Sequence, residues 1–493
     1  MASTILVTLS VAFIFCVSKA LIRGISGPLR KVPGPWYTPF TNLPLKWATI
    51  AGRRVYFVDS LHRKYGDIVR IAPNEVCFRD PAAVKEIHRP ASGFRKDKFY
   101  AKFADDDVED KANMQSFCMI ENKPHAARRR LMARAFSKSE VRRHWEGYIR
   151  NTVSYAVEKM KGDADAHAGE VDVMKWWMLM AADVSSKISF GESFNMLDLG
   201  ELNAYMRAVQ RISKLGGIAA ELSFFKYALE ALRFVPIPSV QEVFNSRQTI
   251  MEISARAIDN SKSSSKSTSI FNGMLAESEK VENSLPRLAL LREARGLIIA
   301  GSDTTAITLT YLIWSVLSRP QLHKQLLEEL QAKLPNNFAD EDLEELPLMN
   351  AIIQETLRLY GAAPGTLPRN PPPGGATLGG VYLSEDTIVS TQAWSLHRNP
   401  EIWKSPEEFD VTRWLPGVEM TDAMRNSFSP FGLGARMCLG IHIAEMELRM
   451  GTATFFRSYP LARLARSTTD ESMAPVNYFV IKPKMNNCKV LLE

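Results

Sequence analysis

The alternation of apolar and polar positions divides the chain into strand-like and helix-like stretches. From about residue 47 to 80, runs such as DIVRIAP and NEVCFRD have the character of strands, and the turn dipeptides Pro73-Asn74 and Asp80-Pro81 separate them. From about residue 137 to 359 the apolar spacing is mostly helical, and from 477 to 492 it alternates again as in strands. The pattern predicts a mainly α-helical fold with small β-sheets in one intertwined domain.

The N-terminus has a different pattern, because residues 2–18 carry no charge and the apolar run continues past Lys19 to Ile22. At about 1.5 Å per residue this helix would reach roughly 30 Å, enough to cross a bilayer if Lys19 snorkels. A cleaved signal peptide is the alternative, but no positive charge precedes the apolar run as such a peptide requires. Basic residues follow it instead, which predicts that the rest of the chain is cytosolic.

We therefore expect three parts along the chain. Residues 1–22 are predicted to be a single-pass membrane anchor, and residues 23–36, which end in KVPGPW, a proline-rich hinge. An ordinary irregular loop is the alternative for the hinge. Residues 37–493 would form the catalytic domain, in which the serine-rich stretch 261–269 is expected to be a surface loop.

Composition and charge exclude some classes of protein. The 493 residues are 46% hydrophobic and 23% charged, as in ordinary globular proteins, and the net charge of +7 is spread along the chain. A nucleic-acid-binding protein would need a basic stripe or a known module, so we expect no nucleic-acid partner. The five cysteines form no CxxC pair, which favours a reducing compartment with at most one thiol in chemistry.

One cysteine stands in a frame of glycines, an arginine and an aromatic residue, in the stretch FSPFGLGARMCLG. The pattern FxxGxRxCxG is met by Phe431, Gly434, Arg436, Cys438 and Gly440, and would arise by chance in on the order of one such chain in ten thousand. Glycines let the backbone approach a flat cofactor closely, and N–H groups aimed at sulfur stabilise a thiolate that binds metal. The helical pattern that follows would direct its positive end at the thiolate. A buried structural cysteine is the alternative.

This frame resembles the haem-binding loop of the cytochrome P-450 family, whose iron takes an axial cysteine thiolate. The resemblance implies the family's fold behind an N-terminal transmembrane helix, with haem b (iron protoporphyrin IX) as cofactor. Cys438 would be the axial ligand of the iron, Arg436 a partner of a haem propionate, and Phe431 the ring that shields the sulfur. Gly432 and Gly440 would belong to the same cofactor loop.

A second region has the pattern expected on the oxygen side of the haem. Residues 285–318 have helical character, with a proline start signal and Arg319-Pro320 as a stop. The stretch AGSDTT in its middle, residues 300–305, places an acid and two hydroxyls in an apolar span, where they need partners or water. It resembles the family's distal motif, in which Ala300 lies against the cofactor, Thr304 supplies the hydroxyl beside oxygen and Asp303 feeds protons through water. Small residues such as Gly301 would leave space there.

A third motif is the buried Glu/Arg brace of the family. QETLRLY places Glu355 and Arg358 on one helical face, where an ion pair by itself is usually solvated. By resemblance the pair is buried and joins Arg413 of FDVTRWL, so that it supports the cysteine loop. Val411 stands where the family often has proline.

Several basic residues are candidates for propionate contacts by the same resemblance. His125 and Arg129 lie four residues apart in HAARRRLMARAFS, on one helical face, although the family often has tryptophan at the position of His125. Arg369 and His397 lie in segments that resemble further propionate contacts.

Three neighbouring arginines, Arg128, Arg130 and Arg134, have two interpretations. They form either a solvated basic patch or a docking surface for an acidic electron-donor protein.

The substrate pocket is predicted from the resemblance alone. Its candidates are the loop 94–122, the stretch 216–235, the turn 363–367, the segment 473–478 and, as single positions, Leu297, Ala300, Ala363, Thr366 and Val476. The apolar stretch 216–235 would either rest on the membrane, giving a lipid-side entrance, or pack in the core.

The function implied is that of a microsomal haem-thiolate monooxygenase of the fungal secondary-metabolism type. It would hydroxylate or epoxidise an apolar small molecule, anchored in the endoplasmic reticulum membrane with its catalytic domain cytosolic. No flavin or dinucleotide-binding segment is visible, so electrons from NADPH would come through a separate cytochrome P-450 reductase, with cytochrome b5 as a second candidate donor.

Two other functions stay open at this level. The same iron can couple phenols or indoles, or close rings, without inserting oxygen. A non-catalytic haem carrier or sensor is an alternative of another class, but it would not need the Asp303 and Thr304 pair.

Overall fold

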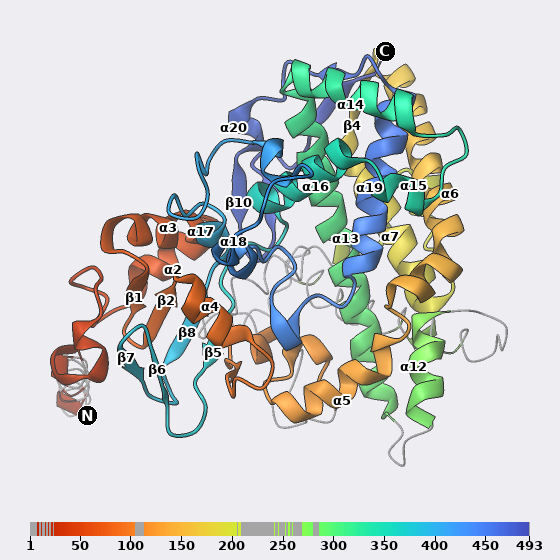
Figure 1. The fold of residues 1–493 in the computed structure, drawn as a ribbon. Coiled ribbons are helices and arrows are strands. Elements are labelled where there is room, and N and C mark those ends of the chain that lie inside the picture. Colours follow the sequence, from red (N-terminus) through yellow and green to blue (C-terminus); the bar gives the residue numbers. More distant parts are fainter. Residues whose placement is uncertain are drawn as a thin grey trace.

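The computed structural model describes residues 24–103, 113–204, 206–208, 269–279 and 285–492, with isolated positions between 7 and 22 and between 241 and 259. Most of the predicted anchor, the stretch 216–235 and residues 261–268 of the predicted surface loop lie outside the described residues. Figure 1 shows a large helical region beside a smaller strand-rich region. The prediction of a mainly helical fold with small sheets is confirmed.

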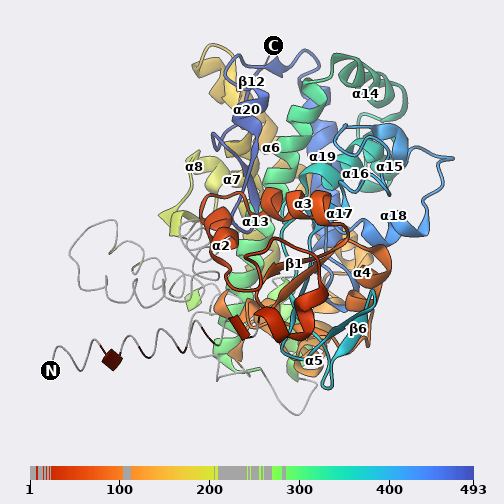
Figure 2. The same ribbon diagram turned by 90° about the vertical axis from the view of Figure 1, so that its left-hand side faces the viewer.

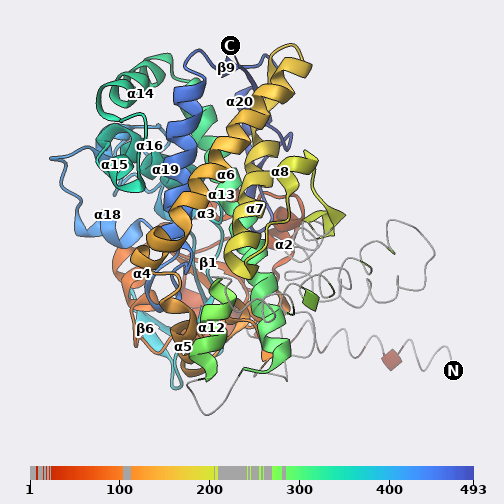
Figure 3. The same ribbon diagram turned by 90° about the vertical axis from the view of Figure 1, so that its right-hand side faces the viewer.

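A bundle of long helices forms the larger region. Its central helix α13 packs against α7, α16 and α19, and α6 crosses beside α7 and α19 (Figure 3). The main hydrophobic core lies between these helices, with residues such as Trp177 and Phe455 fully buried. The helices of this region are α5 (Asn122–Ala133), α6 (Lys138–Ala166), α7 (Val173–Phe190), α8 (Met196–Leu199), α12 (Ile270–Glu279), α13 (Arg287–Leu317), α14 (Pro320–Lys333), α15 (Asp340–Glu344), α16 (Pro347–Tyr360), α19 (Ile441–Ser458) and α20 (Asp470–Met473).

Helix α13 confirms the helix predicted over residues 285–318. Within the described part of the chain it is long and apolar enough to cross a membrane, but 67% of its most apolar window is buried inside the protein. Its apolar surface is therefore covered by neighbouring helices, as expected for a core helix.

The smaller region is built on a five-stranded sheet in the order β1-β2-β8-β5-β3. Strands β2 and β8 are parallel, and the other neighbours are antiparallel. Figure 2 shows α2 and α3 on this side of the molecule, with β1 beneath them. The short helices here and in the connecting loops are η1 (Pro28–Lys31), α2 (Leu43–Ile50), α3 (Arg54–Tyr65), α4 (Pro81–His88), η2 (Tyr100–Phe103), η4 (Ser116–Cys118), α17 (Ala393–Leu396), η5 (Val411–Trp414), α18 (Asp422–Ser427) and η6 (Gly434–Arg436).

The strands themselves are short, and several lie far apart in the sequence. They are β1 (Ile68–Ala72), β2 (Glu75–Phe78), β3 (Arg95–Lys96), β4 (Glu170–Asp172), β5 (Arg369–Asn370), β6 (Ala376–Leu378), β7 (Val381–Leu383), β8 (Ile388–Thr391), β9 (Arg463–Leu464), β10 (Pro475–Asn477), β11 (Ile481–Pro483) and β12 (Lys489–Leu491). Strands β1 and β2 confirm the prediction for DIVRIAP and NEVCFRD. The C-terminal alternation resolves into the hairpin β10–β11 and the separate strand β12, which joins β4 and β9.

The prediction of strands from residue 47 onward is wrong for its first part, where α2 and α3 form instead. In α3 the side chains of Val55, Val58, Leu61 and His62 are all buried. Their spacing of three and four residues is that of one helical face, so the helical period outweighs the β-branched content of this stretch.

Candidate active site

The cysteine frame forms a tight loop that contains η6 and ends at the start of α19. The Cys438 N–H donates to the Phe431 carbonyl oxygen at 2.8 Å, which closes the loop on itself. Gly432 and Gly434 both have positive φ, at 74° and 61°. A Cβ on Gly434 would overlap the carbonyl oxygen of His88 at the end of α4, so this position requires glycine both for its backbone conformation and for its close approach.

Cys438 is an exposed residue of the loop, although many protein atoms surround its sulfur. Burial raises the pKa of this thiol, while the Gly440 N–H and the Arg129 guanidinium lower it. Arg129 is held in place by its bond to the Met437 carbonyl oxygen at 2.7 Å. A metal ion that replaces the thiol proton would offset the desolvation that opposes the thiolate.

Five basic side chains gather beside this loop: Lys96, His125, Arg129, Arg369 and Arg436. Four of them, all except Lys96, line one cavity of about 440 Å³. Burial, together with the charges of its neighbours, lowers the pKa of Lys96 well below its usual value, that of His125 to about 3 and that of Arg436 to about 10. The neighbouring positive charges thus destabilise the charged forms of these groups, and the His125 ring is neutral.

Neutral oxygens, rather than carboxylates, accept the hydrogen bonds of these cations. Arg436 donates to the carbonyl oxygens of Met119 and Ile120 at 2.8 and 3.0 Å, and Arg369 donates to the Tyr100 hydroxyl at 3.0 Å. Among the described residues, no carboxylate oxygen lies within 4.0 Å of the Lys96, Arg129, Arg369 or Arg436 nitrogens. A buried group of uncompensated cations fits a cofactor that brings two carboxylates, as the propionates of haem do.

Lys96 belongs to this cation group although the sequence analysis did not single it out. Its Nζ donates to the Phe117 carbonyl oxygen at 2.7 Å and lies 4.0 Å from the centre of the Tyr100 ring. The only signal in the sequence is a lysine among aromatic residues in FRKDKFY, which does not distinguish it from a surface lysine.

The oxygen-side motif lies at the middle of α13. Ala300 is exposed there although this helix is the core of the bundle, so its face borders an open space. The Thr304 hydroxyl donates to the Ala300 carbonyl oxygen at 2.7 Å. Asp303 is buried, and its carboxylate lies 3.8 Å from Lys482 Nζ of β11. The motif thus has one hydroxyl on the open face and one carboxylate beside a lysine.

Gly301 does not serve the role expected of it. A Cβ at this position would overlap the Ser185 hydroxyl of α7, so Gly301 allows α13 and α7 to approach closely. The exposed position in this stretch is instead Ala300.

Glu447 is a residue of this site that the sequence analysis missed. It is fully buried in α19 and accepts a hydrogen bond from the Thr305 hydroxyl of α13 at 3.0 Å. Its second oxygen has no hydrogen-bond partner among the described residues, and burial raises its pKa to about 8. The sequence offered one signal, an acidic residue within the helical stretch IHIAEMELRMGTATFF. Glu445 lies in the same stretch, so this signal does not single out Glu447.

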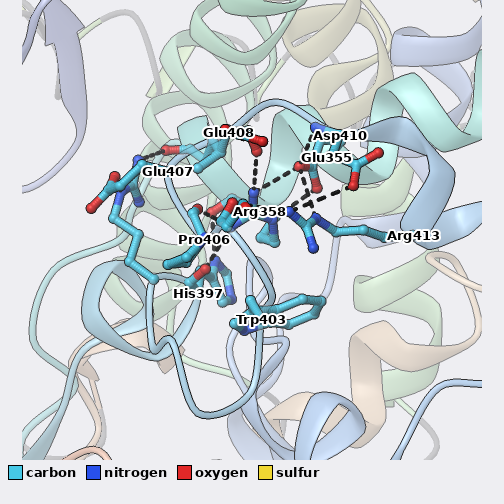
Figure 4. Close-up of polar contacts among 12 residues, drawn as sticks. Glu355, Arg358, His397, Trp403, Pro406, Glu407, Glu408, Asp410 and Arg413 are labelled. Atoms are coloured by element: carbon cyan, nitrogen blue, oxygen red, sulfur yellow. Dashed lines mark hydrogen bonds and ion pairs between the residues drawn. The ribbon is translucent and has the colours of Figure 1, made fainter.

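The Glu/Arg brace is assembled in the structure, as Figure 4 shows. Glu355 accepts two bonds from Arg358, at 2.8 and 2.7 Å, and one from Arg413 at 3.4 Å. Its oxygens also accept from the Trp414 indole N–H and the Asp410 backbone N–H, both at 2.8 Å. The carboxylate is completely buried, and these donors from η5 satisfy it.

His397 lies at the brace and is not brought to the cation group. Its Nδ1 donates to the Arg358 carbonyl oxygen at 2.7 Å, and its Nε2 accepts from the Ser429 N–H at 2.9 Å. Burial lowers its pKa to about 3, so the ring is neutral. Because both nitrogens are engaged, His397 joins the brace to the beginning of the cysteine loop.

Arg128 does not belong to a solvated basic patch. It is buried, and its guanidinium lies 2.9 Å from the carboxylate of Glu293 in α13. Arg130 and Arg134 are exposed, as both interpretations of the basic patch require.

The candidate substrate residues fall into two groups. The turn with Ala363 and Thr366 lies against the β10–β11 hairpin that carries Val476, since the Ile481 N–H donates to the Ala362 carbonyl oxygen at 2.8 Å. The Thr366 hydroxyl is buried without a hydrogen-bond partner among the described residues. Leu297 is half-buried on α13, one turn before Gly301.

Comparisons with known proteins agree with this arrangement. The family model for cytochrome P-450 matches residues 33–490. The cytochrome P-450 monooxygenases stcB of Emericella nidulans and aflV of Aspergillus parasiticus are both 41% identical to this chain over 97% of its length and 91% and 94% of theirs. The methylphloroacetophenone oxidase of Cladonia uncialis is 32% identical over 79% of this chain and 87% of its own.

Proposed function

This chain belongs to the cytochrome P-450 family and is a monooxygenase, and from that premise we propose that Cys438 binds haem b and that the enzyme oxidises an apolar small molecule of fungal secondary metabolism. The observation that carries the proposal is the exposed Cys438 beside a group of basic side chains, of which Lys96, Arg129, Arg369 and Arg436 have no carboxylate oxygen of a described residue within 4.0 Å. When bound, the haem supplies an iron centre that activates dioxygen for insertion into a substrate bond.

The cysteine loop and its neighbours would hold the cofactor. Cys438 would be the thiolate ligand, while Arg129, Arg369, Arg436 and Lys96 would face the propionates. The brace of Glu355, Arg358 and Arg413 would support the loop through His397. This histidine is hydrogen-bonded both to Arg358 and to Ser429. A rigid loop keeps the sulfur in one position, which a metal ligand requires.

Thr304 and Asp303 would hold and move protons on the opposite side. The Thr304 hydroxyl donates to the Ala300 carbonyl oxygen, so its lone pairs would accept a hydrogen bond from a water molecule that carries the proton. Lys482 beside Asp303 stabilises the charged carboxylate, which can then accept a proton from solvent and pass it on.

The electrons would come from NADPH through a separate cytochrome P-450 reductase, with cytochrome b5 as a second donor. Lys123 and Arg130 are exposed on α5, the helix that carries His125 and Arg129, and Arg134 is exposed directly after it. An acidic partner docked on these residues would lie on the same side as the cysteine loop.

The protein would be anchored in the endoplasmic reticulum membrane by residues 1–22, with residues 23–36 as the hinge and the domain from residue 37 in the cytosol. Beyond the anchor, Trp36, Leu43 and Trp47 are 83%, 68% and 72% exposed. Leu43 and Trp47 lie four residues apart and so share one face of α2. Exposed tryptophan and leucine on one face suit the interface of a bilayer.

The proposal is tested by replacing the candidate ligand. Cys438→Ala is expected to lose the thiolate signature in the spectrum of the reduced carbon monoxide complex, because the remaining four cysteines lie elsewhere in the chain. Cys488→Ala removes a buried thiol of similar size and is expected to keep that signature. A thiolate spectrum in Cys438→Ala would contradict the assignment.

A second reaction has one observation in its favour. The relative named methylphloroacetophenone oxidase carries a name that says oxidase and not monooxygenase. Metabolites of cells with and without the gene, grown under heavy-isotope dioxygen, separate the two reactions. A product that carries heavy oxygen indicates insertion, whereas a dehydrogenated or coupled product without it indicates oxidation by hydrogen removal.

A further inference from the structure

Residues 113–120, which we call the strap, run between α13 and the cation group before α5 begins. Five backbone carbonyl oxygens of the strap accept hydrogen bonds from cationic side chains of four other elements. They are the oxygens of Asn113 (from Arg292, 3.2 Å), Met114 (from Arg128, 3.4 Å), Phe117 (from Lys96, 2.7 Å), and Met119 and Ile120 (from Arg436, 2.8 and 3.0 Å). The strap is thus held at one end by α5 and α13, and at the other end by cations that face the cofactor site.

The apolar contacts of the strap are limited. Met114, Cys118 and Met119 are buried, but among the described residues they form a small cluster of their own against Phe103. This cluster is separate from the main core between the long helices. Because few apolar side chains attach the strap, its position depends more on polar bonds than the positions of the bundle helices do.

A single carboxylate fastens the strap to α13. Glu293 accepts a hydrogen bond from the Ser116 backbone N–H on one oxygen, at 2.6 Å, and from the Ser116 hydroxyl on the other, at 3.0 Å. The oxygen that accepts from the N–H also pairs with the Arg128 guanidinium at 2.9 Å. Both charged side chains are buried. Hydrogen bonds to a buried charge are stronger than those between neutral groups, so this contact, which we call the latch, is the firmest attachment of the strap to α13.

The latch lies next to the oxygen-side motif. Glu293, Gly296 and Ala300 are spaced by three and four residues and so share one face of α13. Gln115 of the strap packs at Gly296, where an added Cβ would be 2.6 Å from its Oε1. Ala300, the exposed position of the motif, follows about 6 Å further along the helix axis. The strap therefore crosses α13 one turn before the motif.

We propose that Glu293 is a positioning residue, which holds the strap across α13 and thereby limits the access of water and small ligands to the oxygen-side motif. The inference rests on the proposed function and adds to it a residue outside the cysteine loop and the motif itself. Exclusion of water from such a site prevents side reactions and the loss of protons to solvent. A strap released at this end would open more often and would expose the motif to bulk water.

The test compares two double variants that both lack the buried ion pair. Each contains Arg128→Met, because a buried cation without its carboxylate could prevent folding, whereas removal of both charges with little change in volume is often tolerated. Glu293→Gln keeps an oxygen that can accept the Ser116 N–H, and Glu293→Leu does not. The two variants therefore differ in the latch alone, and the glutamine variant is the matched control.

Amide hydrogen exchange in purified holoenzyme of the full chain measures the latch directly. With Glu293→Leu, the Ser116 N–H is expected to exchange about 10-fold faster than with Glu293→Gln, the effect of one net hydrogen bond. The Cys438 N–H, which donates to the Phe431 carbonyl oxygen, is the internal reference and should keep its protection in both variants. Carbon monoxide binding to the reduced protein after flash photolysis should accelerate by up to the same factor, since the open strap admits the ligand.

Equal exchange of the Ser116 N–H in the two variants would overturn the assignment of Glu293. Faster exchange without faster carbon monoxide binding would overturn its role in limiting access, and a simultaneous loss of protection at Cys438 would show general loosening instead of a latch. The proposed function is tested separately by the unaltered protein. Absence of the thiolate signature from its reduced carbon monoxide complex would refute the haem-thiolate site, whereas the exchange of the Ser116 N–H would still test the latch.

Discussion

At the scale of single residues, Glu447 shows how burial changes the chemistry of a side chain. It lies between α13 and α19, where the Thr305 hydroxyl is its only described hydrogen-bond donor. Burial raises its pKa to about 8, so it holds a proton at neutral pH next to the oxygen-side motif. Asp303 of α13, two residues before Thr305, has a lysine beside it instead. These two buried acids thus have opposite electrostatic surroundings.

The burial of Glu447 predicts how the free energy of unfolding depends on pH. The unfolded chain releases this proton near 4.5, whereas the folded protein keeps it until about pH 8. Its stabilising contribution is therefore complete below pH 4.5 and is lost as the pH rises toward 8, by at most about 1.4 kcal/mol per pH unit. Glu447→Gln should flatten the fall in the free energy of unfolding between pH 5 and 8, as measured by denaturant titration.

The exposed Glu385 provides the comparison for that experiment. Glu385→Gln should leave the pH dependence of stability as in the unaltered protein, because solvent surrounds its carboxylate. If Glu447→Gln also leaves the slope unchanged, the carboxyl is ionised in the folded state and our account of its burial is wrong.

At the scale of elements, the cysteine loop depends on one close approach. Gly434 needs positive φ, and its hydrogen atom faces the His88 carbonyl oxygen with no space for a methyl group. The brace meets the other end of the loop, because His397 contacts both Arg358 and Ser429. The loop is thus held at both ends, by α4 and by α16.

Gly434→Ala should therefore lower the stability of the protein far more than the same substitution in a turn with space for a Cβ. We expect it to lower the free energy of unfolding by about 3 kcal/mol or more and to reduce the haem content of the purified protein, because either α4 or the loop must move. Gly417 has φ of 89° and no atom within 4 Å of an added Cβ. Gly417→Ala should cost only the backbone strain, about 1–2 kcal/mol. Equal losses in the two variants, in denaturant unfolding, would mean that the approach to His88 does not matter.

At the scale of the whole molecule, the exposed apolar residues of α2 lie on a segment that contacts the β10–β11 hairpin. The Asn477 N–H of the hairpin donates to the Gly52 carbonyl oxygen at 2.7 Å, just after α2 with its exposed Leu43 and Trp47. A membrane at α2 would therefore adjoin one wall of the proposed pocket. An apolar substrate dissolved in lipid would have a short path to it.

This arrangement predicts contact between α2 and lipid in the full chain reconstituted into bilayers. Brominated acyl chains should quench tryptophan fluorescence, and the combined change Trp36→Phe and Trp47→Phe should remove most of this quenching. Trp177 is completely buried, and Trp177→Phe should leave the quenched part of the signal in place. Quenching that persists in the Trp36 and Trp47 variant would show that another surface contacts the bilayer.

The sequence by itself determined the features that depend on neighbouring residues. The helical period predicted α13 nearly to its ends, and turn dipeptides separated β1 from β2. The frame around Cys438 predicted a ligand-binding loop, because its glycines and its cysteine all lie within one short stretch of the chain. The members of the brace were also recognisable, since Glu355 and Arg358 lie one helical turn apart and Arg413 is part of a motif.

Only the tertiary structure determined which buried polar and charged side chains contact one another. Arg128 pairs with Glu293, which is 165 residues away, and Thr305 with Glu447, which is 142 residues away. His397 joined the brace and not the cations, and Lys96 joined the cations without any local signal. Periodicity and motifs express the geometry of one chain segment, whereas the partner of a buried charge depends on which helix packs against it. The site was therefore predictable where its chemistry is local and unpredictable where packing brings distant residues together.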